Sequence, residues 1–466
     1  MVKFSFPKPG EIVRDLEGRR YRLIEQLNEG RQGAVFTTED ASILVKVCRP
    51  PQSRHIDETR KQLHLLTRRK LDIGSLVLPR AVLNEPHLGY VMDRVQDSIP
   101  LSNLVYPHPR DRNPNWHILT GGLRRRLRIC AELARAFEQI HRNGLCYVDL
   151  SWQNVLVPSD PTTTSIKLID PDNLIIPGTS LAEVIGTEQF IAPELLKESR
   201  FPNHASDRWS LAVAIFYLLV LNHPFFSDEV INGEPELEEI ALRGELPFIY
   251  SKDNYSKSSS PGLLRGKVLT PRLQKLCIQA FEPGVLDPWA RPSPEEWLSA
   301  LEEAADRTAL CPKCNATSYL PDIRGASLVC DWCGEKSDRP IELGFFDSDP
   351  SIDDLDEDEI RELKRVKKPH RFVLDKGQRM LPQRLVNGDI EATGYVAQFG
   401  FKLNSSGDKI YGLKNLSKDV WKTNNDRERP ETYTKGETVC LFDQMVIYFS
   451  SGVRAKVRNP FRRGKL

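Results

Sequence analysis

Hydrophobic and polar residues follow different patterns in the two halves of this chain of 466 residues. In the first half, the short apolar run Ile43–Cys48 predicts a buried strand, and the amphipathic residues 57–70 after it predict a helix. A longer apolar run at residues 211–221 predicts a buried helix. In the second half, short alternating runs separated by glycine-containing turn pairs fill residues 372–457 and predict an all-β sandwich.

Three oxygen-bearing side chains lie in the middle of the sequence. Asp149 is followed by Asn154, and Asp170 comes after the next apolar run. Magnesium-dependent phosphoryl transfer from ATP needs this chemistry, because one Asp can accept the proton of a hydroxyl while the Asn and the second Asp hold metal ions. The Asp–Asn pair alone is common, so its neighbours in the sequence decide its meaning.

Two of those neighbours lie upstream and are suited to bind phosphate. Gly30 and Gly33 occur in a predicted hairpin turn, where missing side chains would let the backbone cover phosphate groups. Lys46 lies inside the apolar strand, where its ammonium needs a partner. Phosphate oxygens would be one partner and the carboxylate of Glu58 the other, with Gln62, one helical turn later, as the alternative to Glu58.

Further motifs follow at residues 186–194, 206–211 and 291–293. Together the motifs at residues 20–306 resemble those of the eukaryotic-like Ser/Thr protein kinase family, because they occur in the same order and at the same spacings. The resemblance implies an α+β, bilobal protein-kinase-like fold that uses ATP and Mg²⁺. It also implies roles for individual residues: Asp149 as catalytic base steadied by Thr187, Lys46 on the phosphates and oriented by Glu58, and Asn154 and Asp170 on Mg²⁺. The nucleotide would further contact the glycine loop and the hinge, namely Asn28, Gly30, Gly33, Val35, Met92, Asp93, Arg94 and Val95.

Several positions depart from the family pattern. Asn28 replaces a glycine, Leu44 an alanine that packs on adenine, and Ser151 a lysine near the transferred phosphate. Asp172 replaces the glycine that ends the metal motif and would add a carboxylate near the metals. These departures motivate an alternative, a pseudokinase scaffold that binds ATP or only protein partners. Because Tyr147-Val148 replaces the usual His-Arg, we also expect activity without phosphorylation of the activation segment at Thr179, Ser180 or Thr187.

Four of the nine cysteines form two close pairs, Cys311 with Cys314 and Cys330 with Cys333. This spacing predicts a zinc ribbon at residues 307–340, with four thiolates around one Zn²⁺. Asn315 and Gly334 follow the pairs, where left-handed backbone would let amides point at sulfur. Iron in the same cage and disulfides are the alternatives. Since all four ligands are thiolates, the site predicts a structural or partner-binding role and not catalysis.

A charged segment separates the predicted ribbon from the predicted sandwich. Residues 341–371 include a dense acidic run and then a basic one, which predicts a solvated linker. The β domain with its basic tail, residues 372–466, loosely resembles the C-terminal half of forkhead-associated domains around residues 411–417, Trp421 and 436–437. The Arg and Ser that grip phosphothreonine in those domains are not identifiable, which favours a protein-contact role.

Composition excludes some partners. With 65 Lys and Arg against 64 Asp and Glu, the net charge of +1 predicts no binding to nucleic acid or membranes. Residues 1–19 show no signal-peptide pattern, so a cytoplasmic protein is expected. The order of the domains resembles bacterial kinases of tellurite-resistance or stress-linked triads. That resemblance implies a von Willebrand A-domain protein and a PPM-type phosphatase as partners, besides a protein substrate.

Overall fold

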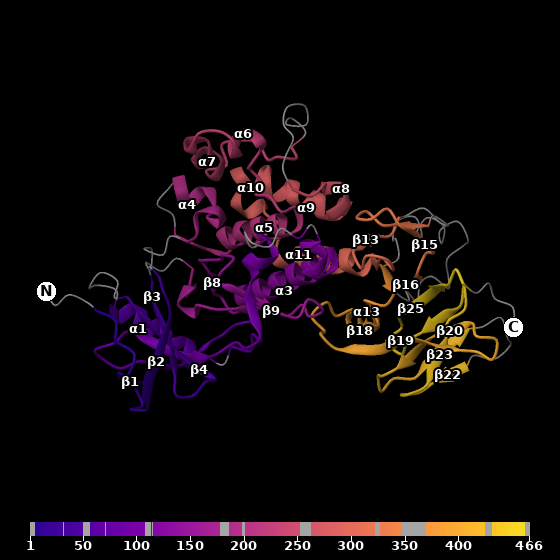
Figure 1. The fold of residues 1–466 in the computed structure, drawn as a ribbon, viewed down its shortest axis with the longest axis horizontal. Helices are drawn as coiled ribbons and strands as arrows, with labels where there is room; N and C mark the ends of the chain where they lie inside the picture. Colours follow the sequence, from indigo (N-terminus) through magenta and orange to yellow (C-terminus); the bar gives the residue numbers. More distant parts are fainter. Residues whose placement is uncertain are drawn as a thin grey trace. The chain divides into compact units, whose positions relative to one another are not determined.

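The structure is a computed structural model that forms two compact units, described separately below (Figure 1). The first comprises Met1–Gly121 and Arg125–Leu298, and the second Gly122–Arg124 and Ser299–Leu466. The structure describes residues 5–30, 32–49, 56–69, 71–107, 113, 115–177, 186–197, 201–251, 262–321, 327–346, 370–424 and 431–461. The candidate phosphorylation sites Thr179 and Ser180 lie outside these ranges, as does most of the acidic run.

The first unit begins with an antiparallel sheet of six strands in the order β1-β2-β3-β4-β6-β5. Its strands are β1 Ile12–Arg14, β2 Arg20–Glu29, β3 Gly33–Thr38, β4 Ile43–Cys48, β5 Pro79–Val82 and β6 Gly89–Asp93. Helix α1, Ile56–Arg68, follows β4 and buries Leu63 and Leu66, so the predicted strand and helix are confirmed. The expected boundary at residue 19 is wrong, because β1 pairs with β2 and buries Val13 in the core of the sheet.

The rest of the first unit is mainly helical. Helix α5, His204–Val220, is buried on nearly every side, as the apolar run at residues 211–221 predicts. It begins at a capping box in which the Asn203 side chain accepts hydrogen bonds from backbone amides, and it ends at Leu221 in left-handed conformation. The other helices are α2 Trp116–Leu119, α3 Gly122–Arg142, α4 Pro193–Lys197, α6 Asp228–Ile231, α7 Pro235–Leu242, α8 Arg265–Val268, α9 Pro271–Phe281, α10 Pro283–Leu286 and α11 Pro294–Asp306. The first three residues of α3 and the residues of α11 from Ser299 onward belong to the second unit.

Short strands lie in the segments between these helices. They form two small antiparallel sheets, β10-β9-β7 and β11-β8. The strands are β7 Ser98–Pro100, β8 Cys146–Tyr147, β9 Val155–Pro158, β10 Lys167–Leu168 and β11 Leu174–Ile175. No helix within the described ranges combines the length and the hydropathy that crossing a membrane requires.

The second unit starts with two small hairpins that hold the paired cysteines. Strand β12, Thr308–Leu310, pairs with β13, Thr317–Tyr319, and β14, Leu328–Val329, pairs with β15, Lys336–Ser337. Asn315 and Gly334 have φ angles of 61° and 71°, so the expected left-handed backbone after each cysteine pair is confirmed.

Two antiparallel sheets enclose one hydrophobic core in the remainder of the second unit. The sheets have the orders β17-β16-β25-β24-β21-β22 and β18-β19-β20-β23, and buried residues such as Phe372, Trp421 and Leu413 from both sheets share the core. The elements are β16 Ile341–Phe346, β17 His370–Leu374, β18 Met380–Pro382, α13 Arg384–Asn387, β19 Tyr395–Leu403, β20 Lys409–Asn415, β21 Trp421–Asn424, β22 Glu431–Tyr433, β23 Thr438–Cys440, β24 Val446–Tyr448 and β25 Arg454–Arg458.

Two expected boundaries of the second unit are wrong. The linker was expected from residue 341, but β16 occupies Ile341–Phe346 and pairs with both β17 and β25, because Ile341, Leu343 and Phe345 point into the core. The kinase domain was expected to end at residue 306, whereas the second unit begins at Ser299. The physical reason is the buried Arg384, which pairs with acidic residues near the end of α11.

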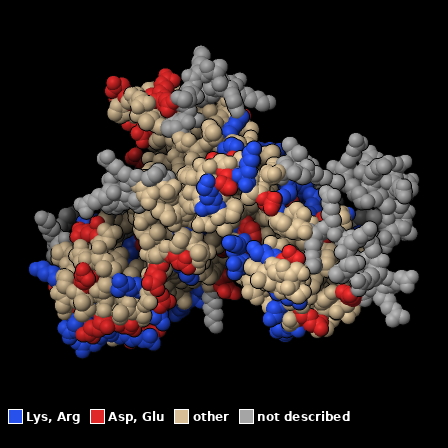
Figure 2. Space-filling model, turned by 45° about the vertical axis from the view of Figure 1, so that its right-hand side comes forward, with Lys and Arg blue, Asp and Glu red and all other residues tan. Residues whose placement is uncertain are grey.

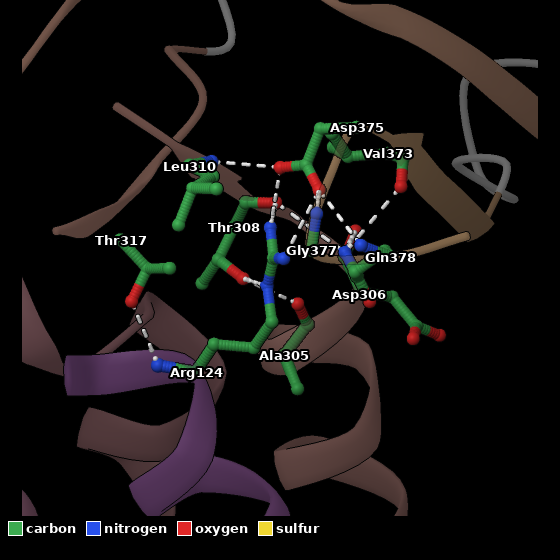
Figure 3. Close-up of polar contacts among 10 residues, drawn as sticks. All are labelled: Arg124, Ala305, Asp306, Thr308, Leu310, Thr317, Val373, Asp375, Gly377 and Gln378. Atoms are coloured by element: carbon green, nitrogen blue, oxygen red, sulfur yellow. Dashed lines mark hydrogen bonds and ion pairs between the residues drawn. The ribbon is translucent and has the colours of Figure 1, made fainter. Parts of the chain in front are cut away.

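A buried polar network links distant segments of the second unit (Figure 3). The Arg124 guanidinium donates to both carboxylate oxygens of Asp375, at 3.1 and 2.7 Å, and to the hydroxyl of Thr308 at 2.7 Å. The backbone amide of Leu310 donates to Asp375 as well. Burial alone would raise the pKa of Asp375, but Arg124 and these amide donors lower it below its ordinary value.

Charged side chains of both signs are interspersed on the face drawn in Figure 2.

Candidate active site and metal centre

Asp149 lies in the loop between β8 and β9, where other side chains fix its carboxylate. The backbone amide and the hydroxyl of Thr187 donate to Asp149 Oδ1 at 2.9 and 3.1 Å. The Asn154 amide nitrogen donates to the Asp149 carbonyl oxygen at 2.9 Å and to Oδ2 at 3.3 Å. Asp149 therefore contacts both Asn154 and Thr187 directly, and the sequence predicts that these three residues act together.

The loop itself is held from α5. The buried Asp207 accepts a hydrogen bond from the backbone amide of Tyr147 at 2.9 Å and pairs with His141 Nε2 at 3.0 Å. Burial raises the pKa of Asp207, and the contacts with His141 and Tyr147 oppose that rise. Gly186 passes close to the same loop, since a Cβ there would lie 2.7 Å from the Val148 carbonyl oxygen. A larger residue would therefore displace Thr187 from Asp149.

Asp170 follows β10 and is tied to Asn154 through the backbone, because the Ile169 amide donates to the Asn154 carbonyl oxygen at 3.0 Å. Asp170 has left-handed backbone, with φ of 58°, and a 3₁₀ turn, Pro171–Asn173, begins immediately after it. Burial raises the pKa of Asp170, and nearby Asp172 and Asp149 also raise it, while Lys46 opposes them. These three carboxylates are thus within electrostatic reach of one another.

Lys46 on β4 makes its ion pairs with this turn. Its Nζ lies 2.9 Å from Asp170 Oδ1 and 3.0 Å from both carboxylate oxygens of Asp172. Only 3% of Lys46 is exposed. Burial alone would lower its pKa, but Asp172 and then Asp170 raise it above the ordinary value. Lys46 therefore stays a cation in a buried setting.

The expected pairing of Lys46 with Glu58 is not what the structure shows. Glu58 is exposed on the first turn of α1, whereas both carboxylates at Lys46 come from the Asp170–Asp172 turn. Gln62, the alternative, points toward that turn and donates to the backbone carbonyl oxygens of Asp172 and Leu174. The sequence does show a second Asp two residues after Asp170. Its spacing does not reveal that Lys46 is the partner of this second Asp, Asp172.

The predicted nucleotide-contacting residues of the glycine loop and the hinge lie on β2, β3 and β6 or just after the ends of β2 and β6. Asn28 pairs with Val35 across the hairpin, and the Gly30 amide donates to the Gly33 carbonyl oxygen at 2.9 Å. Gly33 needs to be glycine, since a Cβ there would lie 2.5 Å from the Val47 carbonyl oxygen. Apolar side chains suited to contact an adenine ring pack together in one hydrophobic cluster, namely Val35, Leu44, Met92, Val95 and Ile169.

The remaining hinge residues lie at the end of β6. Asp93 ends β6 and forms an exposed ion pair with Arg80 at 2.9 Å, and the Arg94 amide donates to the Ser42 carbonyl oxygen at 2.8 Å.

Asp170 and Asn154 offer a carboxylate and an amide oxygen, the hard ligands that Mg²⁺ prefers, so the residues present fit the metal ion.

Another ion pair lies among the helices of the first unit. The fully buried Arg291 donates to both carboxylate oxygens of Glu194, at 2.8 and 2.7 Å, and its guanidinium lies 4.9 Å from the centre of the Trp209 ring. A bidentate pair of this kind fixes α4, and with it the segment that follows Thr187.

The four paired cysteines form a candidate metal centre. The sulfur atoms of Cys311, Cys314, Cys330 and Cys333 all lie within 4.8 Å of one another, with 3.7 Å between Cys311 and Cys333 and 3.6 Å between Cys314 and Cys330. Tetrahedral Zn²⁺ with Zn–S bonds of about 2.3 Å needs sulfurs roughly 3.8 Å apart. Burial raises the pKa of Cys311, but the amides of Cys314 and Lys313 lower it to about 7. The cluster is therefore compatible with Zn²⁺.

Comparisons with known proteins match part of this chain to protein kinases. Residues 122–299 match the protein kinase domain family. The chain is 27% identical over 220 residues to the serine/threonine-protein kinase KIN1 homolog of Encephalitozoon cuniculi, covering 46% of this chain and 38% of that protein. It is 37% identical over 127 residues to serine/threonine-protein kinase SBK2 of Rattus norvegicus, covering 23% of this chain and 35% of that protein.

A third relative is protein kinase C-like 1 of Saccharomyces cerevisiae, 30% identical over 148 residues, which cover 29% of this chain and 12% of the yeast protein. The chain thus spans well under two thirds of the length of each of these relatives. All three matches are to protein kinases, and two of those kinases are named for serine and threonine. The chain therefore contains a protein kinase domain, with homologues among the serine/threonine kinases.

Proposed function

We propose that the protein is a Ser/Thr protein kinase that transfers the γ-phosphate of ATP to a hydroxyl group of a protein substrate. One observation carries the proposal. A continuous set of contacts runs from Thr187 through Asp149 and Asn154 to Ile169, the residue before Asp170, and Asp170 in turn contacts Lys46. The proposed base, metal ligands and phosphate-binding lysine therefore belong to one connected site.

In this proposal Asp149 accepts the proton of the substrate hydroxyl as that oxygen attacks the γ-phosphate. Asn154 and Asp170 hold Mg²⁺, which offsets the negative charge of the phosphates when it is bound. Lys46 binds the α- and β-phosphates, and the Gly30–Gly33 turn covers them. Thr187 keeps the Asp149 carboxylate in the orientation that proton transfer requires.

The second unit would serve to recruit a protein partner. Its cluster of four cysteines, once loaded with Zn²⁺, would hold the two hairpins together, because such short strands bury almost no core of their own. Exposed apolar side chains at Tyr395, Phe401 and Leu403 on β19 offer a contact surface. A von Willebrand A-domain protein and a PPM-type phosphatase are the partners that we would test first.

The test is to incubate the purified full chain with Mg²⁺, radiolabelled ATP and a generic protein substrate, beside the variants Asp149→Asn and Lys46→Met. We expect labelled substrate with the wild type and at least about a hundredfold less with either variant. Ser151 favours the alternative of a scaffold, since its side chain is buried, accepts a hydrogen bond from the backbone N–H of Asn154 and supplies no cation. Equal labelling in all three proteins, or none in the wild type, would support the scaffold.

A further inference from the structure

We propose that Asp172 is the positioning residue of Lys46, taking the role that the sequence assigned to a glutamate on α1. The inference deepens the proposed kinase function, because its consequence concerns how Lys46 meets the phosphates of ATP. It makes the last residue of the Asp170-Pro171-Asp172 motif part of the phosphate-binding machinery.

The first support is the geometry at the ammonium. Both carboxylate oxygens of Asp172 lie 3.0 Å from Lys46 Nζ, whereas Asp170 contributes one oxygen at 2.9 Å. The Asp172 side chain is only 13% exposed, and Lys46 lies beside it at 4%. Charge-assisted contacts from two oxygens fix the direction of the ammonium as well as its distance.

The second support is the shape of the turn. Asp170 has left-handed backbone, and the 3₁₀ turn Pro171–Asn173 follows at once. This backbone brings the side chains at positions 170 and 172 to the same ammonium group, although they are two residues apart. A glycine at position 172 would leave Lys46 with Asp170 as its carboxylate in this turn, and Asp170 is the residue needed for Mg²⁺.

The third support is that strand β6 and helix α1 hold Asp172 in place. The Tyr90 hydroxyl on β6 donates to Asp172 Oδ1 at 2.7 Å. Gln62 on α1 donates to the backbone carbonyl oxygens of Asp172 and Leu174. Gln62 therefore secures the turn without a charge, which leaves the carboxylate of Asp172 for Lys46.

These contacts imply different roles for the carboxylates of Asp170 and Asp172. Asp170 can turn to Mg²⁺ while the Asp172 carboxylate stays beside Lys46, so the buried ammonium retains a partner when the metal binds. Helix α1 then contributes a neutral hydrogen bond to the site instead of an ion pair.

Thermal unfolding of the full chain without nucleotide tests the pairing. The variants are Lys46→Met, Asp172→Asn and their combination, with Glu58→Gln and Lys46→Met/Glu58→Gln as the matched control cycle. The change in melting temperature caused by Asp172→Asn should be more favourable in the Lys46→Met background than in the wild type, by roughly 4 °C. Glu58→Gln should cause the same change in both backgrounds. Equal changes for Asp172→Asn in the two backgrounds would overturn the pairing.

Steady-state kinetics tests the positioning role. With Asp172→Asn we expect kcat/KM for ATP to fall roughly 10-fold to 100-fold, with KM for the protein substrate unchanged and with Glu58→Gln close to the wild type. Equal losses with Asp172→Asn and Glu58→Gln, or none with Asp172→Asn, would overturn the role. Absence of phosphoryl transfer by the wild type would instead refute the proposed function, while the unfolding cycle still decides the pairing.

Discussion

Arg124 and Asp375 form a bidentate ion pair in which the side chains are 11% and 9% exposed and both oxygens of the carboxylate are used. Arg124 lies in the first turn of α3, and Asp375 follows β17, so the pair joins segments separated by 251 positions of the chain (Figure 3). Because Asp375 also accepts the amides of Leu310 and Gln378, one carboxylate organises the start of the ribbon and the turn after β17.

Replacing Arg124 with Met should destabilise the second unit, because it leaves a buried carboxylate without its cation. We expect a loss of about 3–5 kcal/mol in the free energy of unfolding, measured by denaturant titration of the full chain. Arg142→Met is the control, since Arg142 pairs with Glu138 and is half exposed, and it should cost under about 1 kcal/mol. Similar losses in the two variants would contradict the role of the Arg124 pair.

Thr187 should matter through its hydroxyl. Thr187→Ala removes one of the two donors to Asp149 Oδ1, and we expect kcat to fall roughly tenfold or more. Thr187→Ser keeps the hydroxyl and should retain most of the activity, also when combined with Thr179→Ala and Ser180→Ala. An inactive triple variant would show that activity depends on phosphorylation of this segment.

Zinc content offers a test of the four-cysteine cluster that is independent of activity. Elemental analysis of the purified chain should give one Zn²⁺ per molecule, and Cys314→Ser should lose it. Cys440→Ser removes a thiol that lies outside the cluster and should keep the metal. Retention of full zinc by Cys314→Ser, or iron in place of zinc, would contradict the assignment.

His223 should make the first unit less stable in mild acid. Its buried ring pairs through Nε2 with the Gln189 carbonyl oxygen and through Nδ1 with the Phe225 amide, so the neutral form fits. Burial lowers its pKa from 6.5 to about 3, opposed by the contact with Gln189.

The folded state therefore binds fewer protons than the unfolded state below pH 6.5. The contribution of neutral His223 to the free energy of unfolding is fully present above that pH. It is lost as the pH drops toward 3, by up to about 1.4 kcal/mol per pH unit. His223→Gln should flatten this dependence in thermal unfolding scans between about pH 7 and pH 5. An unchanged slope would show that His223 is not the responsible group.

Local patterns allowed much of the first unit to be predicted. The strand Ile43–Cys48, the following helix and the buried α5 all follow from apolar spacing within a short window. The motif residues Asp149, Asn154 and Thr187 could likewise be chosen from their order along the chain, and the structure brings them into contact.

What the sequence could not reveal depends on contacts between distant segments. Glu58 and Gln62 are one helical turn apart, so spacing alone could not decide which of them faces the Asp170–Asp172 turn. The strand Ile341–Phe346 directly precedes a dense acidic run, which hid its unbroken run of buried residues. Its register with β17 and β25 depends on chain segments far along the sequence.

The most direct test of the central claim is to identify the product by mass spectrometry after the full chain, Mg²⁺, ATP and a protein substrate are incubated together. The account predicts phosphoserine or phosphothreonine in the substrate with the wild type. It predicts none above background with Asp170→Asn, although that variant should still be folded. Equal phosphorylation by the two proteins, or none by the wild type, would contradict the account.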